Sequence, residues 1–279
     1  MIEAPTGRAE VRAWLDAQAD RVAGLARAGV ARIVGRNLDT WAGSLTASGD
    51  LAVLGDIPGA WMTFVHEELL DALGELHYAG VMQAWVANPA VLPELVAEAW
   101  TSVVNEAAVS YMTGAANRLV GVGDAMWRGV RSQVVAAVQK GETTEELKGR
   151  LEQITHWSEM RADTVARTET NAAYVQGELA AQQALPDGPV EKVWVAALDN
   201  RTRDTHAEAH DQCVPFDEKF IVGGVAMDAP FDPAAPPGEV VNCRCVVEYL
   251  YPGDTRPDGS VIEGAVTSDD AADPAMLDP

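Results

Sequence analysis

Through about residue 185, the apolar residues of this chain recur at helical spacing, and the alternation typical of strands is nearly absent. Such stripes run from Trp61 to Leu76, from Leu92 to Ala107 and from Trp127 to Val138. Each covers one face of a helix that is too apolar to stand alone in water. The pattern therefore predicts a helical region over residues 1–185, whose helices pack on one another or on a partner.

Several signals predict where these helices begin. Pro58 suits a first-turn position, since its missing N–H has no partner there in any case. Thr143 and Glu146 have the spacing of a capping box that opens a helix through Leu151. A last long helix is expected from about residue 158 to 185.

The segment Pro186-Asp187-Gly188-Pro189 ends that helix and marks the clearest domain boundary. Residues 186–252 predict a small α+β domain, and the fold class is therefore α+β with a mostly helical N-terminal region. The tail, residues 253–279, is rich in Pro, Gly and Asp and is predicted to be disordered and acidic. The elements expected in the small domain are a strand at 193–198, a short helix at 202–212, a hairpin at Gly223-Gly224 and a closing strand at 240–251.

Charge narrows the classes of partner. The chain has 20 Lys and Arg against 42 Asp and Glu, a net charge of −22, which argues against binding duplex DNA over a broad face. The arginines between Arg8 and Arg36 make the first helix the one markedly basic element, which could contact nucleic acid or an acidic partner, or simply be solvated. With no secretory pattern and no long apolar run, we expect no membrane span. Three cysteines, all between residues 213 and 245, suit folding in a reducing cytoplasm.

The residues with the clearest chemistry are His206, His210, Cys213, Cys243 and Cys245. On a helix the first three lie at i, i+4 and i+7, so they would share one face. On a strand, the last two would point to the same side, with Arg244 on the other. Tetrahedral Zn²⁺ takes four nitrogen or sulfur ligands, and a bound metal would stabilise so small a domain. The spacing therefore makes zinc a candidate cofactor.

Other interpretations explain the same residues. Cys243 and Cys245 can be small buried thiols, with His206 bonded to a backbone carbonyl. A disulfide from Cys213 would need an oxidising compartment. A metal-dependent hydrolase or nuclease acting on DNA, with His206 and His210 around an ion, is the alternative function, although nothing in the spacing identifies an open coordination position or a general base.

Polar residues precede the short helix. Asp199 or Thr202 is expected to cap its first turn, and Arg201 or Arg203 to pair with nearby acids.

The order of these residues resembles the C-terminal domain of phage Mu F-like minor head proteins, a head-morphogenesis family of tailed phages. The resemblance rests on the Asp199-x-Arg201-Thr202 element, the Gly-Gly hairpin, a proline-rich loop and the closing Asn242-Cys243-Arg244-Cys245. A preceding Arg167-Thr168-Glu169 is similar to the helix that leads into that domain. The likeness covers roughly residues 155–250.

The resemblance implies a structural minor capsid protein rather than an enzyme. Its partners would be the portal protein or the major capsid protein, its location the interior of the phage head, close to packaged DNA, and it would need no membrane or small-molecule substrate. His206, Cys243 and Cys245 are the safest metal ligands, completed by His210 or Cys213. Asn242 is expected to bond backbone near the closing strand, and Arg244 to contact a partner or an acid inside the domain.

Some members of the family are fused to ADP-ribosyltransferases, which combine an Arg, a Ser-Thr-Ser strand and a Glu-x-Glu turn. This chain has no Ser-Thr-Ser, and Glu169 is followed by Thr170 and Asn171. We therefore expect Arg167 and Glu169 to form a polar pair on the helix instead.

Overall fold

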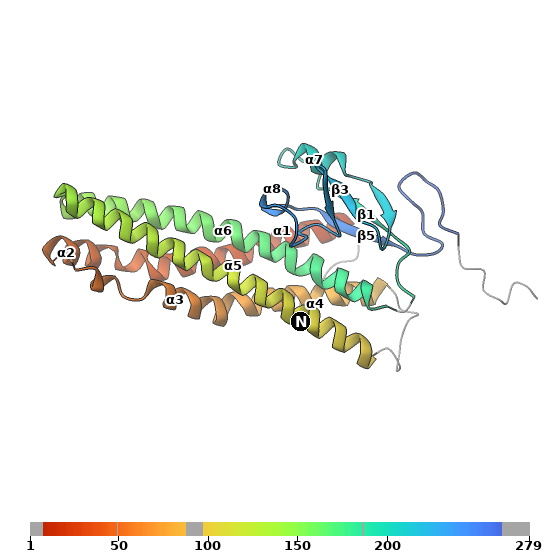
Figure 1. Ribbon diagram of the computed structural model, residues 1–279, viewed down its shortest axis with the longest axis horizontal. Helices are drawn as coiled ribbons and strands as arrows, with labels where there is room; N and C mark the ends of the chain where they lie inside the picture. The colour runs from red at the N-terminus through yellow and green to blue at the C-terminus, as the bar shows by residue number, and fades with distance from the viewer. Residues whose placement is uncertain (1–7, 49, 88–96, 186, 264–279) are drawn as a thin grey trace, which may run out of the picture.

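The computed structural model describes residues 8–48, 50–87, 97–185 and 187–263. Its N-terminal part is an elongated bundle of helices, and a small domain with a sheet lies at one end of it (Figure 1). The first part of the bundle comprises α1 (Arg8–Ile33), η1 (Gly35–Asn37), α2 (Leu38–Ser48), η2 (Leu51–Leu54), α3 (Ile57–Phe64), η3 (Val65–Leu69) and α4 (Leu70–Ala87), followed by the longest helices, α5 (Ala97–Lys140) and α6 (Thr144–Gln183).

Residues of two expected apolar stripes, 61–76 and 127–138, lie in the core of the bundle. Trp61, Leu69 and Leu73 are fully buried, and so is Val130 on α5. Pro58 lies in the first turn of α3, as its position predicts. The stripe from Leu92 begins outside the described residues, and its described part lies on α5.

Two helix boundaries differ from the sequence prediction. The stripes at 97–107 and 127–138 belong to one helix, α5, because no proline interrupts residues 108–126. The helix that opens at Thr143 likewise continues past Leu151 to Gln183, since residues 152–157 contain no Gly or Pro. Its capping box is present as predicted, with Thr143 and Glu146 bonded reciprocally.

Glycines let the bundle helices approach closely. A Cβ on Gly80 of α4 would lie 2.1 Å from the carbonyl oxygen of Tyr174, and one on Gly177 of α6 would lie 2.2 Å from that of His77. Both distances are shorter than any packing contact, so this part of the α4–α6 interface requires residues without a side chain.

The small domain contains a three-stranded antiparallel sheet in the order β2-β1-β5 and a separate β3-β4 hairpin. Trp194, on β1, is fully buried between the rings of His206 and Phe220. The hairpin turns at Gly223 and Gly224, both at positive φ, as predicted. The elements of the domain are β1 (Glu191–Val195), α7 (Asp204–Glu208), β2 (Cys213–Pro215), β3 (Phe220–Val222), β4 (Val225–Met227), α8 (Pro237–Val240) and β5 (Val246–Leu250).

The domain shares its apolar core with the bundle. The buried cluster around Trp194 also includes Val11 and Leu15 of α1, and Tyr174 and Val175 of α6. A helical region and a small α+β domain are thus both present, as the sequence predicts, but the C-terminal half of α6 belongs to the packing of both.

Residues 253–263 are part of the folded domain, which corrects the prediction of a disordered tail from residue 253. Arg256 forms a two-pronged ion pair with Glu191 at 2.7 Å, and Ile262 is buried in the core. A bridge between Thr255 and Val261 closes this turn. Residues 264–279 lie outside the described part of the chain.

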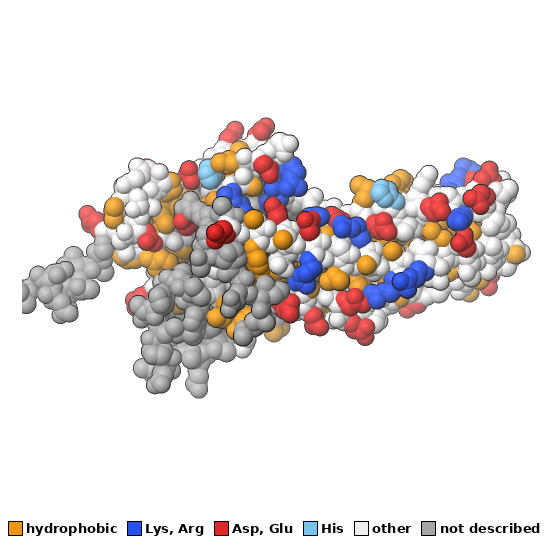
Figure 2. All heavy atoms as spheres, turned by 180° about the vertical axis from the view of Figure 1, so that it is seen from behind, with side chains coloured by type: hydrophobic (Ala, Val, Ile, Leu, Met, Phe, Trp, Pro, Cys, Tyr) orange, Lys and Arg blue, Asp and Glu red, His pale blue; other side chains and the backbone are white. Residues whose placement is uncertain are grey.

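The basic first helix is largely paired within the molecule. Arg21, Arg27 and Arg32 form ion pairs with acids of α4, α6 and η3. On the face seen in Figure 2, acidic and basic side chains are interspersed along the bundle. None of the helices in the described residues has the length and apolar character needed to cross a bilayer.

Candidate metal centre

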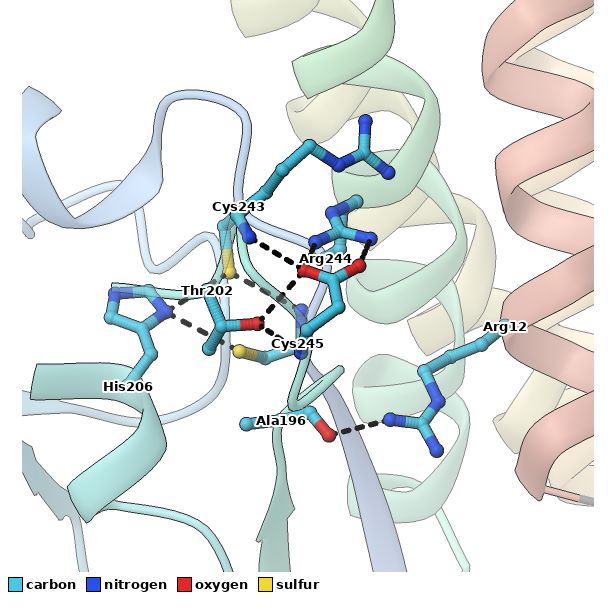
Figure 3. A network of polar contacts seen from close by, with 9 residues as sticks. Arg12, Ala196, Thr202, His206, Cys243, Arg244 and Cys245 are labelled. Atoms are coloured by element: carbon cyan, nitrogen blue, oxygen red, sulfur yellow. Dashed lines mark hydrogen bonds and ion pairs between the residues drawn. The ribbon is translucent and has the colours of Figure 1, made fainter. Parts of the chain in front are cut away.

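A histidine and two cysteines meet where the small domain faces the bundle. His206 Nδ1 lies 3.3 Å from Cys245 Sγ and 3.6 Å from Cys243 Sγ, and all three side chains are buried. Figure 3 shows the imidazole of His206, on α7, facing both sulfur atoms. These are the three residues that the resemblance identifies as the safest ligands.

The two cysteines reach this position from a loop and not from a strand. The closing strand is shorter than predicted, because Pro236 and Pro237 begin α8 and the chain then turns at Asn242, whose φ is +55°. Asparagine tolerates this left-handed conformation better than most residues. The turn directs both sulfurs to His206, so the predicted convergence occurs although its predicted cause is wrong.

His210 and Cys213 lie elsewhere, which corrects the expectation that one of them completes the set. Helix α7 ends at Glu208, and the left-handed Asp211 (φ +63°) turns the chain into β2. His210 Nδ1 therefore accepts a hydrogen bond from the Ala196 N–H. Cys213 donates to Glu191 at 3.2 Å, and neither belongs to the cluster found in the described residues.

A carboxylate orients the histidine. Glu239 Oε2 lies 3.0 Å from His206 Nε2, and it also accepts from the Thr205 hydroxyl. Because a carboxylate accepts hydrogen bonds, Nε2 donates to Glu239, and Nδ1 is the ring nitrogen that faces the sulfurs. A carboxylate on the far nitrogen is the usual second partner of a metal-bound histidine. Glu239 is not among the site residues predicted from the sequence.

The environment moves the pKa of each ligand. Burial lowers the pKa of His206, but the hydrogen bond and charge of Cys243, with Glu239, outweigh it, so the net shift is upward. The hydrogen bond with Cys243 lowers the pKa of Cys245 in spite of burial, whereas burial raises that of Cys243. Of the two thiols, Cys245 is therefore the one that ionises more readily.

The cluster supplies three of the four ligands that a zinc ion needs. One imidazole nitrogen and two sulfurs, all within 4.8 Å of one another, are ligands that Zn²⁺ prefers, and a water or another donor would supply the fourth. The predicted pair of His206 and His210 around an ion, on which the hydrolase alternative rests, is not formed.

The polar residues before α7 form their own turn instead of capping the helix. Asp199 accepts from the Arg201 N–H, and the Thr202 hydroxyl accepts from the Asp199 N–H. Helix α7 begins later, at Asp204, with no side-chain cap. Arg203 donates to the carbonyl oxygen of Val241, so the predicted pairing of Arg201 or Arg203 with an acid is absent among the described contacts.

Arg244 forms a two-pronged ion pair with Asp199, one contact of which is 2.7 Å, and Figure 3 shows it directed away from the sulfurs. Of the two roles expected for Arg244, the structure favours the acid inside the domain. Asn242 acts through its backbone N–H, which donates to the Thr168 hydroxyl on α6.

The Arg-Thr-Glu segment of α6 is bound to the bundle. Glu169 is buried and forms a two-pronged ion pair with Arg118 of α5, at 2.5 and 2.7 Å, and it accepts from the Tyr111 hydroxyl. Arg167 pairs with Asp163 and Asp20. The expected Arg167–Glu169 pair is therefore wrong, since residues two apart on a helix do not face each other.

A mixed-charge cavity of about 590 Å³ lies beside the cluster, between α1, α6 and the cysteine loop. Its lining includes Arg167, Arg201 and Arg203 together with Asp16 and Asp20. Several of these charged side chains are bound within the molecule. Arg167 pairs with Asp20 and Asp163, and Arg203 donates to the carbonyl oxygen of Val241.

Residues 128–248 match the family model described as Phage Mu protein F like protein. Over this segment the chain is similar to the Mu F-like family. The resemblance stated from the sequence is therefore confirmed. The match begins earlier than the predicted residue 155, and it includes the end of α5 and all of α6. It crosses the boundary predicted between residues 185 and 186, as does the shared core.

Two curated relatives support the match. The minor head protein GP7 of Bacillus phage SPP1 is 31% identical over 130 residues, which cover 43% of this chain and 40% of that protein. A protein of Enterococcus faecalis named NAD(+)–arginine ADP-ribosyltransferase EFV is 29% identical over 140 residues, covering 49% of this chain and 28% of the relative. The chain thus spans less than half the length of either one. No solved structure matches.

Proposed function

We propose that this protein is a structural minor head protein of a tailed phage, which binds the portal protein or the major capsid protein during head assembly and remains inside the head. The observation that carries the proposal is that the Mu F-like match covers one physical unit, α6 with the domain packed on it. The similarity to a minor head protein adds support.

We assign the partner contact to the exposed apolar side of α6. Trp157 and Met160 are 61% and 57% exposed and lie three residues apart, on one face of the helix. Large aromatic and Met side chains are enriched at the centres of protein interfaces. In an assembled head, a partner protein would cover these two apolar side chains, which are exposed to water in the isolated chain.

The test is co-purification with the portal or major capsid protein of the same phage. Trp157→Ala should weaken the complex at least tenfold, because a central tryptophan contributes about 2 kcal/mol or more to binding. Ile221→Ala is the matched control, since Ile221 is 54% exposed but lies on the β3–β4 hairpin. Failure of the unmodified chain to bind either head protein would contradict the proposal.

We further propose that His206, Cys243 and Cys245 hold a zinc ion whose role is to stabilise the domain. When bound, zinc would cross-link α7 to the loop before β5 and so supply folding free energy. In this role the metal acts on structure, and Glu239 holds the imidazole in the right tautomer.

Metal analysis of the purified full chain tests this assignment. We expect about one zinc per chain, lost in Cys243→Ser and Cys245→Ser and retained in Cys213→Ser, which removes a thiol outside the cluster. Mutation of His206 adds a test of the enzyme alternative: a structural site predicts loss of folding or assembly, whereas a catalytic one predicts an incorporated but inactive protein. Folded wild-type protein free of metal would reject the zinc site.

A further inference from the structure

Two side chains of α6 bind the backbone that carries the cysteines. The Asn171 side chain, only 5% exposed as a residue, donates from Nδ2 to the carbonyl oxygen of Cys243 at 3.3 Å. The Thr168 hydroxyl accepts from the Asn242 N–H at 3.1 Å while it donates to the Thr164 carbonyl at 2.8 Å. Both residues belong to the bundle, and both act on the loop that ends in the ligands.

Both hydrogen bonds lie at the strained part of that loop. Asn242 is in the left-handed region, which a non-glycine residue keeps only where its surroundings determine it. The two hydrogen bonds from α6 lie on either side of this residue, one at the N–H of Asn242 and one at the carbonyl oxygen of Cys243. They therefore fix the direction in which Cys243 Sγ leaves the backbone.

A third contact joins the same domain to α1. Arg12 donates to the carbonyl oxygen of Ala196, directly after β1, at 2.5 Å (Figure 3). The backbone around the cluster is thus bound to two helices of the bundle, and Ala197, the next residue, lines the same small cavity as Cys245.

We propose that Thr168 and Asn171 are positioning residues of the metal centre, so that metal binding and the docking of the small domain on α6 stabilise each other. The proposal rests on the zinc site proposed above. Outer partners of metal ligands orient them, and loss of one commonly costs 10–100-fold in metal affinity. Linkage then requires that the metal strengthen the contacts of α6 with the loop by the same factor.

The first experiment measures zinc affinity of the full chain by competition with a chromogenic chelator. Asn171→Ala and Thr168→Val should each weaken affinity about tenfold or more. Matched controls are Asn37→Ala and Thr113→Val, because each of these side chains donates to a carbonyl four residues earlier in the chain, that of Ile33 and that of Val109. Controls should bind zinc as the wild-type chain does.

The second experiment needs no variant, and so decides the matter even where a substitution prevents folding. Hydrogen exchange of the wild-type chain is compared with and without chelator. Removal of zinc should speed exchange in residues 242–246 and in the adjoining turns of α6, and leave the far end of α6, near Leu147, unchanged.

The outcomes separate the two proposals. Zinc bound with unaltered affinity in both α6 variants, or exchange that responds only within the small domain, overturns the coupling and leaves the zinc site in place. A wild-type chain that binds no zinc overturns both.

Discussion

The two halves of α6 bury different chemistry. From Leu147 to Ala166 the buried residues are mainly apolar or small, and they pack in the core of the bundle. From Glu169 to Gln182 the buried positions include a series of polar side chains, Glu169, Asn171, Glu178 and Gln182 among them. The first half of α6 stabilises the fold by burying apolar area. The second half also forms directed hydrogen bonds, which specify the position of the elements packed against it.

The two kinds of contact differ in how closely they constrain the sequence. Apolar packing tolerates many sequences of similar volume, whereas a hydrogen bond requires a given atom at a given place. The Arg-Thr-Glu and Asn-Cys-Arg-Cys segments form directed contacts, from Glu169 to Arg118, from Thr168 to Asn242 and from Asn171 to Cys243, while the family match itself spans both halves of α6.

The largest expected effect lies in the apolar half. Leu151→Ala removes a fully buried side chain from the bundle core and should lower the free energy of unfolding by about 3 kcal/mol. Chemical denaturation followed by circular dichroism measures it. Zinc affinity should not change, and a marked loss of zinc would contradict the separation of the two halves.

The next effect lies in the polar half. Arg118→Ala leaves the carboxylate of Glu169 buried without its cation, but Arg118 is 48% exposed, so water reaches the site and limits the cost to about 2 kcal/mol. Glu169→Gln in the same background should recover part of that loss, since the amide carries no charge. Equal stability of the single and double variants would show that the buried charge is not the cause.

The last effect concerns Glu178, and it depends on pH. Burial raises the pKa of Glu178 to about 8, above its ordinary value of 4.5. The folded chain therefore keeps a proton that the unfolded chain loses as pH rises from about 4.5 to 8, so this residue makes stability fall over that window.

Glu178→Gln removes this titration and should stabilise the protein at pH 8, with almost no effect near pH 4. Melting temperatures of both proteins across this range measure the difference. A gain that is the same at both pH values would mean that the amide improves packing and that charge plays no part.

Much of the site could be recognised from the sequence, but its geometry could not. The Asn-Cys-Arg-Cys segment and His206 identify the ligands by residue type and by resemblance. Their arrangement depends on left-handed residues, Asn242 and Asp211, that end one element and begin another. Periodicity describes regular elements, and for this reason it wrongly placed His210 and Cys213 on the helix of His206.

The sequence by itself determined which segments are helical, where the capping box and the Gly-Gly turn lie, and which family the C-terminal half resembles, because these depend on neighbouring residues. Only the tertiary structure decided that α6 is shared by both cores, that Glu239 orients His206, that Arg244 binds Asp199, and that residues 253–263 fold back on β1. Those contacts join residues far apart in the chain, and their stability comes from burial and hydrogen bonds that exist only once the elements have packed.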